Sequence, residues 1–320
     1  MKIWTWVGAV AALLCSVVYA GGAETAGAKY APFGVGLLNE AQLKDLPAEV
    51  LATVNGAKIT REFLESKIAD ASENEQPGME QSRPFLLAQF VQREILLQKA
   101  RKDGLLKKDA DETAENEAIH ALMQKCTDGV EVKDSELREV YEKYKRGFGG
   151  ASFEEAKPTL QKNVLAQKKQ MAVLMLMEET GKNAKVAVNA AWAAEQNKLL
   201  TDNDLDRGLK AGKIMMVEFT GEGCVYCKQM APIIKELEAE QKDVNIVSID
   251  IDKHRELMLR YDVQGVPVQV FFSAKGEEVY RHEGLWTKKG IVEKLDALRA
   301  GKVVAPGHYH SVGKKAAPKK

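Results

Sequence analysis

The chain has 320 residues, of which 45% are hydrophobic and 29% are charged, as in ordinary globular proteins. This length predicts two domains, each large enough for its own hydrophobic core. Lysine plus arginine and aspartate plus glutamate both number 46, so the formal net charge is zero. That balance argues against nucleic acid as the main partner, because nucleic-acid binding usually needs a basic surface.

Residues 1–20 have the composition of a signal peptide. Lys2 gives a positive start, a mostly apolar run follows, and Val18 and Ala20 are small enough for a signal peptidase. We therefore expect export to the periplasm, an oxidising compartment. The alternative is an uncleaved anchor in the inner membrane, with the rest of the chain facing the periplasm, although the apolar run is short for a full span.

Two stretches predict little regular structure. Residues 21–47 are rich in glycine and alanine without periodicity, which predicts a linker or loosely ordered arm. Residues 303–320 contain four lysines and no acidic residue, which predicts a basic flexible tail or a weak contact with an anionic surface. His308 and His310 lie in this tail, but two ligands do not make a metal site.

Residues 48–190 predict a mainly α-helical domain between two short strands. The opening strand alternates through Val54 and ends at an Asn-Gly turn, and residues 184–188 form the closing strand. A break is expected at residues 76–78. The last helix begins with the capping-box pattern of Ser152 and Glu155. The helices expected between the strands cover residues 60–71, 82–102, 111–126, 134–146 with Asp134 as its cap, and 152–180.

This order of elements resembles the N-terminal helical domain of SurA-type periplasmic chaperones. The matching stretches are ATVNGAKITREFLESKI, LLAQFVQREILLQKARKDGL, VKDSELREVYEKYK, SFEEAKPTLQKNVLAQKKQ and NAKVAV. The resemblance implies that the two strands pair, joining Thr53 and Val54 to Val186 and Val188. It also implies a domain that binds unfolded or partner proteins, and a homodimer through this helical domain is possible.

The last helix of that region is rich in methionine, at Met171, Met175 and Met177. We predict that these side chains pack into the core of the domain. The alternative is an adaptable apolar surface for unfolded chains, because methionine repacks easily.

Residues 191–302 predict a helical connector followed by an α/β domain. Strands alternate with helices at first, which implies parallel pairing, and a closing hairpin makes the sheet mixed. The expected strands are residues 214–219, 245–250, 268–272 and 277–281, and the expected helices are residues 224–241, 253–261 and 287–298.

This domain resembles thioredoxin over residues 198–301. The matching stretches are VEFTGEGCVYCKQMAP, VSIDIDKHRELMLRYDVQGVPVQVFF and GEEVYRHEGLWTKKGIVEKLDAL. The resemblance implies a thioredoxin fold, thiol–disulfide exchange without a cofactor other than the Cys224–Cys227 pair, and a cis peptide bond before Pro267. It also implies that Val266 and Pro267 lie against the pair and hold an extended substrate, with Tyr226 as a further substrate-binding residue.

The two cysteines occupy different positions in the predicted helix. Cys224 lies at its N-terminus, where free backbone N–H groups and the helix dipole stabilise a thiolate, so we expect it to be the nucleophile. Cys227 follows one turn later and can attack the mixed disulfide to release the product. A structural zinc site would need two more ligands. An inert structural disulfide is the other alternative.

Glu218 is a carboxyl in an apolar strand just before the active-site turn. Burial there would raise its pKa. It aligns with the buried aspartate of thioredoxins, so the resemblance implies that Glu218 helps to deprotonate the second cysteine. The alternative is a partly solvated residue without a role.

Three residues around the pair depart from the thioredoxin pattern. Gly223 stands where tryptophan is usual, and Val225-Tyr226 matches neither the Gly-Pro of reducing thioredoxins nor the Pro-His of periplasmic oxidants. The direction of electron flow therefore stays open. The remaining thiol outside the predicted signal, Cys126, is expected to be buried and inert, with an intermolecular disulfide or a resolving role as alternatives.

The leading hypothesis is an exported thiol–disulfide oxidoreductase, a reductase or isomerase, whose helical domain recruits unfolded or misbridged proteins. Its partners would be disulfide-containing or unfolded proteins and a redox protein that recycles the cysteine pair. One alternative is a holdase chaperone in which the thioredoxin fold is mainly a binding module. Another is a dedicated reductase for one partner, such as an apocytochrome.

Overall fold

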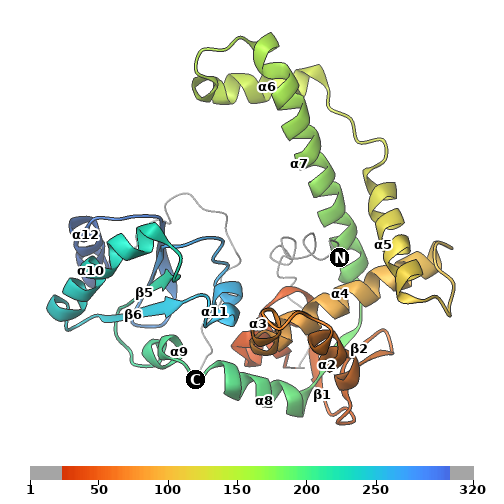
Figure 1. Ribbon diagram of the computed structural model, residues 1–320, viewed down its shortest axis with the longest axis horizontal. Coiled ribbons are helices and arrows are strands. Elements are labelled where there is room, and N and C mark those ends of the chain that lie inside the picture. Colours follow the sequence, from red (N-terminus) through yellow and green to blue (C-terminus); the bar gives the residue numbers. More distant parts are fainter. Residues whose placement is uncertain (1–23, 303–320) are drawn as a thin grey trace. The chain divides into compact units, whose positions relative to one another are not determined.

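The computed structural model describes residues 24–302 (Figure 1). The predicted signal peptide and basic tail lie outside these residues. Backbone contacts divide the described chain into two compact units. Residues 92–184 form one unit, and residues 24–91 together with residues 185–302 form the other. One division therefore falls within a predicted helix, between residues 91 and 92, and the other falls between residues 184 and 185.

The first sheet joins both ends of the predicted helical region. Its strand order is β1-β4-β2-β3. The predicted pairing of the opening and closing strands is confirmed, because β2 runs antiparallel to β4 with Val54 opposite Val186 and Thr53 opposite Ala187. The four strands are β1 (Gln42–Lys44), β2 (Val50–Val54), β3 (Ala57–Thr60) and β4 (Val186–Asn189).

Residues 24–47 are not the loosely ordered arm that we predicted. Helix α1 (Ala26–Lys29) and two 3₁₀ turns (Ala31–Phe33 and Gly36–Leu38) precede β1, which pairs in parallel with β4. Phe33 and Leu38 are fully buried, and the Phe33 ring meets the edge of the Trp192 ring at 5.6 Å. A few large anchors at irregular spacing hold this segment, so no periodicity reveals it.

The next helices largely follow the expected pattern. Helix α2 (Arg61–Ala69) begins at the predicted cap Thr60, whose Oγ1 accepts a hydrogen bond from Phe63 N at 3.2 Å. Helix α3 (Gln76–Gln81) begins where we predicted a break, because Pro77 in a first helical turn lacks only an N–H that has no partner there. Helix α4 (Arg83–Lys102) follows.

The unit of residues 92–184 contains the end of α4 and three further helices. These are α5 (Glu112–Thr127), α6 (Asp134–Tyr144, followed by a 3₁₀ turn at Lys145–Phe148) and α7 (Phe153–Lys182). The capping box of α7 is confirmed, since Ser152 N donates to Glu155 Oε2 at 2.7 Å. Lys133, not Asp134, is the cap of α6, because its backbone N–H bonds the Glu136 side chain.

The methionines of α7 do not share one environment. Met177 is buried, as predicted. Met171 and Met175 are 53% and 63% exposed, so the prediction that they pack into the core is wrong. Most of the surface of both side chains faces solvent, and sequence periodicity cannot tell a covered helix face from an open one.

The C-terminal region contains the second sheet. Its order is β6-β5-β7-β8, with β5 parallel to β6 and antiparallel to β7, so the predicted mixed sheet is confirmed. The strands are β5 (Met215–Thr220), β6 (Asn245–Asp250), β7 (Val268–Phe272) and β8 (Glu278–Glu283). The helices are α8 (Ala190–Leu200), α9 (Asp204–Leu209), α10 (Val225–Glu240), α11 (Arg255–Arg260) and α12 (Lys288–Arg299).

Both faces of this sheet are buried. Alternate residues of β5 point to opposite faces, so Met216 packs with residues of α10 and α12 while Val217 packs with residues of α9 and α11. Figure 1 shows α10 and α12 side by side over the sheet. Burying each such side chain stabilises a fold by roughly 2 kcal/mol. The sheet is therefore a firm support for the turn at the end of β5.

Among residues 24–302, no helix is both long and apolar enough to cross a membrane.

Candidate active site

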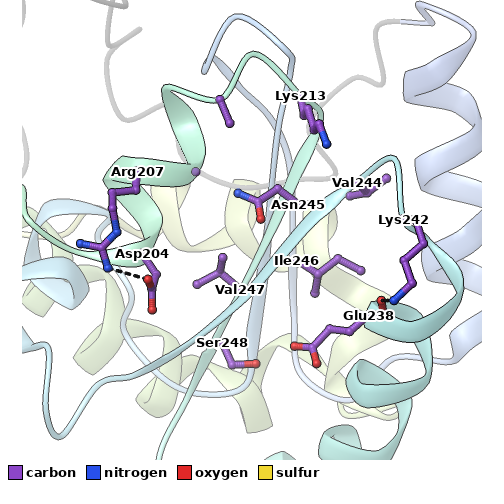
Figure 2. A pocket seen from close by; sticks show the side chains of 12 residues that line it. Asp204, Arg207, Lys213, Glu238, Lys242, Val244, Asn245, Ile246, Val247 and Ser248 are labelled. Atoms are coloured by element: carbon purple, nitrogen blue, oxygen red, sulfur yellow. Dashed lines mark hydrogen bonds and ion pairs between the residues drawn. The ribbon is translucent and has the colours of Figure 1, made fainter.

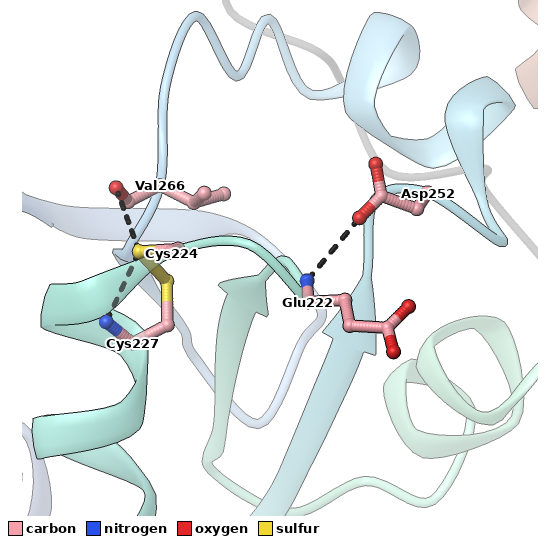
Figure 3. The surroundings of a disulfide bond; sticks show 5 residues. All are labelled: Glu222, Cys224, Cys227, Asp252 and Val266. Carbon is pink, nitrogen blue, oxygen red and sulfur yellow. Dashed lines mark hydrogen bonds between the residues drawn. A yellow bond between two sulfur atoms is a disulfide. The ribbon is translucent and has the colours of Figure 1, made fainter.

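The cysteine pair lies at the start of α10, directly beyond the end of β5 (Figure 3). Cys224 and Cys227 are joined in a disulfide. Cys224 is the N-cap of the helix, and its Sγ accepts a hydrogen bond from Cys227 N at 3.0 Å. A sulfur that already takes the place of a capping oxygen would carry a negative charge there at low cost, because helix N-termini stabilise anions.

The two cysteines differ in exposure. Cys224 is half-buried, whereas Cys227 is 4% exposed. The residues between them are open to solvent, with Val225 and Tyr226 66% and 59% exposed. An approaching protein therefore meets Cys224 and the Val225-Tyr226 surface before it can reach Cys227.

The predicted cis peptide bond is present between Val266 and Pro267. The carbonyl oxygen of Val266 lies 3.5 Å from Cys224 Sγ, so the loop borders the pair as expected (Figure 3). The Pro267 carbonyl accepts a hydrogen bond from Gly284 N at 2.8 Å, which ties this loop to the end of β8. The backbone of Val266 is thus held beside the sulfur that a substrate would meet.

The turn before the pair is also tethered. Glu222 N donates to Asp252 Oδ2 at 3.2 Å, which links the turn to the segment after β6 (Figure 3). A Cβ atom placed on Gly223 would meet no atom within 4 Å. The position that carries tryptophan in thioredoxins is therefore open space here.

Glu218 is buried within β5, as its apolar neighbours predict. The pKa of the Glu218 carboxyl is raised to about 7. Burial is the largest cause of this rise, a hydrogen bond with the Ser248 side chain opposes it, and the nearby Glu238 charge adds to it. A carboxyl with a pKa near neutrality can both accept and release a proton at physiological pH.

A groove of about 740 Å³ runs along the outer edge of β6 (Figure 2). It is lined by residues of α9, β6 and the end of α10, with acidic and basic side chains mixed, and the cysteines are not among its lining residues. Ser248 and Glu238 line it, and both act on the pKa of Glu218. The groove is therefore adjacent to the buried carboxyl and separate from the cysteine pair.

Among residues 24–302, no group of three or more His, Cys, Asp or Glu side chains is arranged to hold a metal ion.

Cys126 belongs to the other compact unit. It is half-buried, and its thiol donates to the Met123 carbonyl at 3.1 Å. Burial raises the pKa of the Cys126 thiol, which makes it a weak nucleophile.

Sequence reasoning missed three polar residues that share a face of the sheet with Glu218. Ser248 is its partner on β6, and Gln269 is its partner on β7. Gln269 is in turn opposite His282 on β8. A signal for Gln269 was present, because it interrupts the apolar run of β7 at a position that is buried on both sides.

Comparison with known proteins gives matches to the C-terminal domain. The family model described as Thioredoxin matches residues 196–297. The thioredoxin of Staphylococcus aureus is 30% identical over 98 residues, which cover 30% of this chain and 92% of the relative. The protein disulfide-isomerase erp38 of Neurospora crassa is 36% identical over 105 residues, covering 32% of this chain and 28% of the relative.

A chloroplast relative gives a similar result. The thioredoxin-like protein HCF164 of Arabidopsis thaliana is 32% identical over 114 residues, covering 33% of this chain and 44% of the relative. The chain therefore spans less than half the length of the two longer relatives and nearly all of the bacterial one. The residues matched by the family model include Cys224 and Cys227.

Proposed function

The chain belongs to the thioredoxin family through residues 196–297, and from this premise we propose that it is a thiol–disulfide oxidoreductase acting on protein disulfides. The observation that carries the proposal is the asymmetry of the cysteine pair. Cys224 is half-buried and caps α10, whereas Cys227 is buried one turn later and bonded to it. A purely structural disulfide has no need for one reachable sulfur at a helix N-terminus.

Reduction of a substrate proceeds in two balanced exchanges. The Cys224 thiolate attacks one sulfur of the substrate disulfide, forming a mixed disulfide and releasing the other sulfur as a thiolate, which takes up a proton. Glu218 accepts the proton of the Cys227 thiol, and the Cys227 thiolate attacks Cys224 Sγ. The second substrate sulfur then leaves as a thiolate, and the Cys224–Cys227 disulfide remains.

The disulfide must then be reduced by another protein before the next cycle. In isomerisation no net electrons are transferred, because a second thiolate of the substrate attacks the mixed disulfide and releases Cys224 unchanged. The Val266 backbone, beside Cys224 Sγ, would hold an extended substrate strand during either exchange, and Tyr226 offers an exposed ring next to the entry point.

The remainder of the chain fits an exported enzyme that recruits its substrates. The signal-like composition of residues 1–20 supports export to the periplasm, and the SurA-type resemblance of residues 48–190 supports binding of unfolded or partner proteins. The exposed side chains of Met171 and Met175 also favour such binding, since methionine adapts to many apolar partners. The same exposure makes a holdase chaperone the second candidate function.

Insulin reduction and refolding of scrambled ribonuclease test the proposal. The wild-type chain and a Cys224→Ser variant would be compared in both assays, with aggregation suppression measured in parallel. We expect the variant to lose both redox activities and to keep any suppression of aggregation. Full redox activity in Cys224→Ser would contradict the oxidoreductase function, and aggregation suppression alone in the wild-type chain would favour the holdase.

A further inference from the structure

A row of polar side chains crosses the second sheet beneath α10 and α12. Glu218 on β5 lies opposite Gln269 on β7, and Gln269 lies opposite His282 on β8. Residues directly opposite on antiparallel strands have Cβ atoms roughly 5 Å apart and point to the same face. The three side chains are therefore immediate neighbours, on the same face as Met216 and Phe271 of the apolar core.

Every member of this row has a buried polar atom without a hydrogen-bond partner among the described residues. These atoms are Glu218 Oε1, Gln269 Nε2, Gln269 Oε1 and His282 Nε2. Gln269 is fully buried and Glu218 is 3% exposed, so bulk water does not form hydrogen bonds with their polar atoms. Buried polar atoms are nearly always paired, and an unpaired group is costly.

The four atoms are complementary. The amide Nε2 of Gln269 is a donor, and Glu218 Oε1 is an acceptor. His282 Nε2 is a donor in the tautomer that carries its hydrogen there, and Gln269 Oε1 is an acceptor. Two donors therefore face two acceptors along one row, in the order His282, Gln269, Glu218.

We propose that His282, Gln269 and Glu218 form a hydrogen-bonded relay, directly or through a bridging water, in which Gln269 is the positioning residue for the Glu218 carboxylate. The relay rests on the proposed function, because it prepares Glu218 to accept the proton of Cys227. It assigns roles to two residues outside the cysteine pair and its bordering loop.

The His282 end of the row is fixed. Its ring stacks on Trp286 with centroids 4.3 Å apart and planes 21° apart. With His282 Nε2 donating, the Gln269 amide turns its oxygen toward His282 and its nitrogen toward Glu218. A donor aimed at Glu218 stabilises the carboxylate and so opposes the rise in the Glu218 pKa that burial causes.

The other groups that act on Glu218 come from β6 and α10. Ser248 lowers the pKa of Glu218 through a hydrogen bond, and the charge of Glu238 raises it. In the proposed cycle the proton donor to Glu218 is the Cys227 thiol, in the first turn of α10. A change at Gln269 leaves all of these groups in place, so its effect can be separated from theirs.

The test is the Glu218 pKa itself, measured by NMR of carboxyl-¹³C-labelled glutamate in the oxidised full-length protein. Gln269→Met keeps the volume and removes both polar atoms, and we expect the pKa to rise by about one unit, a tenfold gain in proton affinity. His282→Phe keeps the stacking on Trp286. We expect it to raise the Glu218 pKa as well, with a gain in proton affinity of roughly threefold. Gln229→Met, on the exposed surface of α10, is the matched control and should leave the pKa unchanged.

A Gln269 amide that has no partner gives the opposite pattern. Gln269→Met would then leave the Glu218 pKa unchanged and raise the denaturation midpoint, because it would remove unpaired buried atoms. That result would overturn the relay. A second measurement uses the wild-type chain and so does not depend on the folding of a variant. The ¹⁵N chemical shift of the Gln269 side chain should change with pH as Glu218 titrates. A ¹⁵N shift that does not change with pH would contradict the proposal.

These readouts are independent of catalysis. If the wild-type chain reduces insulin but Gln269→Met leaves the Glu218 pKa unchanged, the proposed function stands and the relay is wrong. If the wild-type chain has no redox activity but Gln269→Met raises the Glu218 pKa as expected, the relay stands and the proposed function is wrong.

Discussion

The C-terminal domain and the unit of residues 92–184 are built in different ways. The C-terminal domain has a sheet with a separate apolar core on each face. Residues 92–184 have two smaller clusters, one around Leu97 and Leu122 and the other around Leu137 and Leu160. Helix α7 has 30 residues, of which four are buried.

This difference matches the two tasks that we propose. Disulfide exchange needs a nucleophile, a resolving thiol and a proton acceptor held in fixed positions, and a sheet packed on both faces provides that rigidity. Binding of unfolded chains needs apolar surface that can adapt, and long helices with exposed methionines provide it. Substitutions in the two regions should therefore have effects of different size and kind.

The largest expected effect is at Cys227. Cys227→Ser should lower multiple-turnover insulin reduction by at least about a thousandfold, because the mixed disulfide with Cys224 can no longer be resolved. The trapped adducts would be identified by non-reducing gels and mass spectrometry. Cys126→Ser, in the other unit, is the matched control and should retain the wild-type rate. Rapid turnover by Cys227→Ser would show that Cys227 is not the resolving thiol.

Substitution of one methionine in each region compares how tightly the two regions are packed. Met216→Ala removes a fully buried side chain of β5 and should lower the free energy of unfolding by about 2–5 kcal/mol. Met175→Ala removes a side chain that is 63% exposed and should change the free energy of unfolding by less than about 0.5 kcal/mol. Urea denaturation followed by circular dichroism measures both. A large loss in Met175→Ala would mean that this side chain is covered in solution.

Glu218 should make the stability of the C-terminal domain depend on pH. Its folded-state pKa of about 7 lies above the ordinary value of 4.5, so the folded state binds the proton more tightly than the unfolded state. The stabilisation is fully present below about pH 4.5 and is lost as the pH rises to 7, amounting to about 3 kcal/mol. Glu218→Gln should therefore stabilise the domain at pH 8 and have little effect at pH 4.5.

Denaturation curves at both pH values would check this, with Glu222→Gln as the control because Glu222 is exposed. An equal effect of Glu218→Gln at the two pH values would indicate that the carboxyl is solvated. The relay predicts that Gln269→Met raises the pH at which the stabilisation by protonated Glu218 is lost.

The smallest expected effect is at a helix cap in residues 92–184. Asp111 caps α5 by accepting a hydrogen bond from Ala114 N at 2.9 Å. Asp111→Ala should destabilise that unit by about 1 kcal/mol, whereas Asp111→Asn keeps a capping oxygen and should cost less. Hydrogen exchange of α5 amides would measure the difference, and insulin reduction should stay unchanged in both variants.

The sequence predicts the C-terminal domain more closely than the rest. Strands β6 and β7 have the predicted bounds, because short apolar runs between turn signals leave few alternatives. The cis bond before Pro267 follows from the family resemblance, since an X–Pro pair by itself does not indicate its isomer. The position of Glu218 in an apolar strand was sufficient to predict its burial.

Other features depend on which segments meet, and a single sequence does not contain that information. Phe33 and Leu38 are buried in a segment without periodicity, and Met171 and Met175 remain exposed in a segment with it. The row through Gln269 is visible only when the register of β5, β7 and β8 is known. Local patterns predict elements, whereas tertiary contacts decide which faces are covered.

The alkylation of each cysteine as a function of pH tests the central claim most directly. The reduced protein would be treated with iodoacetamide, and the modified peptides would be quantified by mass spectrometry. We predict that Cys224 reacts first, with an apparent pKa at least about one unit below the usual 8.5, and that Cys227 reacts at least about tenfold more slowly. Cys126 is the internal reference from the other unit, with a pKa above the usual range. Equal rates for Cys224 and Cys227, or faster modification of Cys227, would contradict the assignment of Cys224 as the nucleophile.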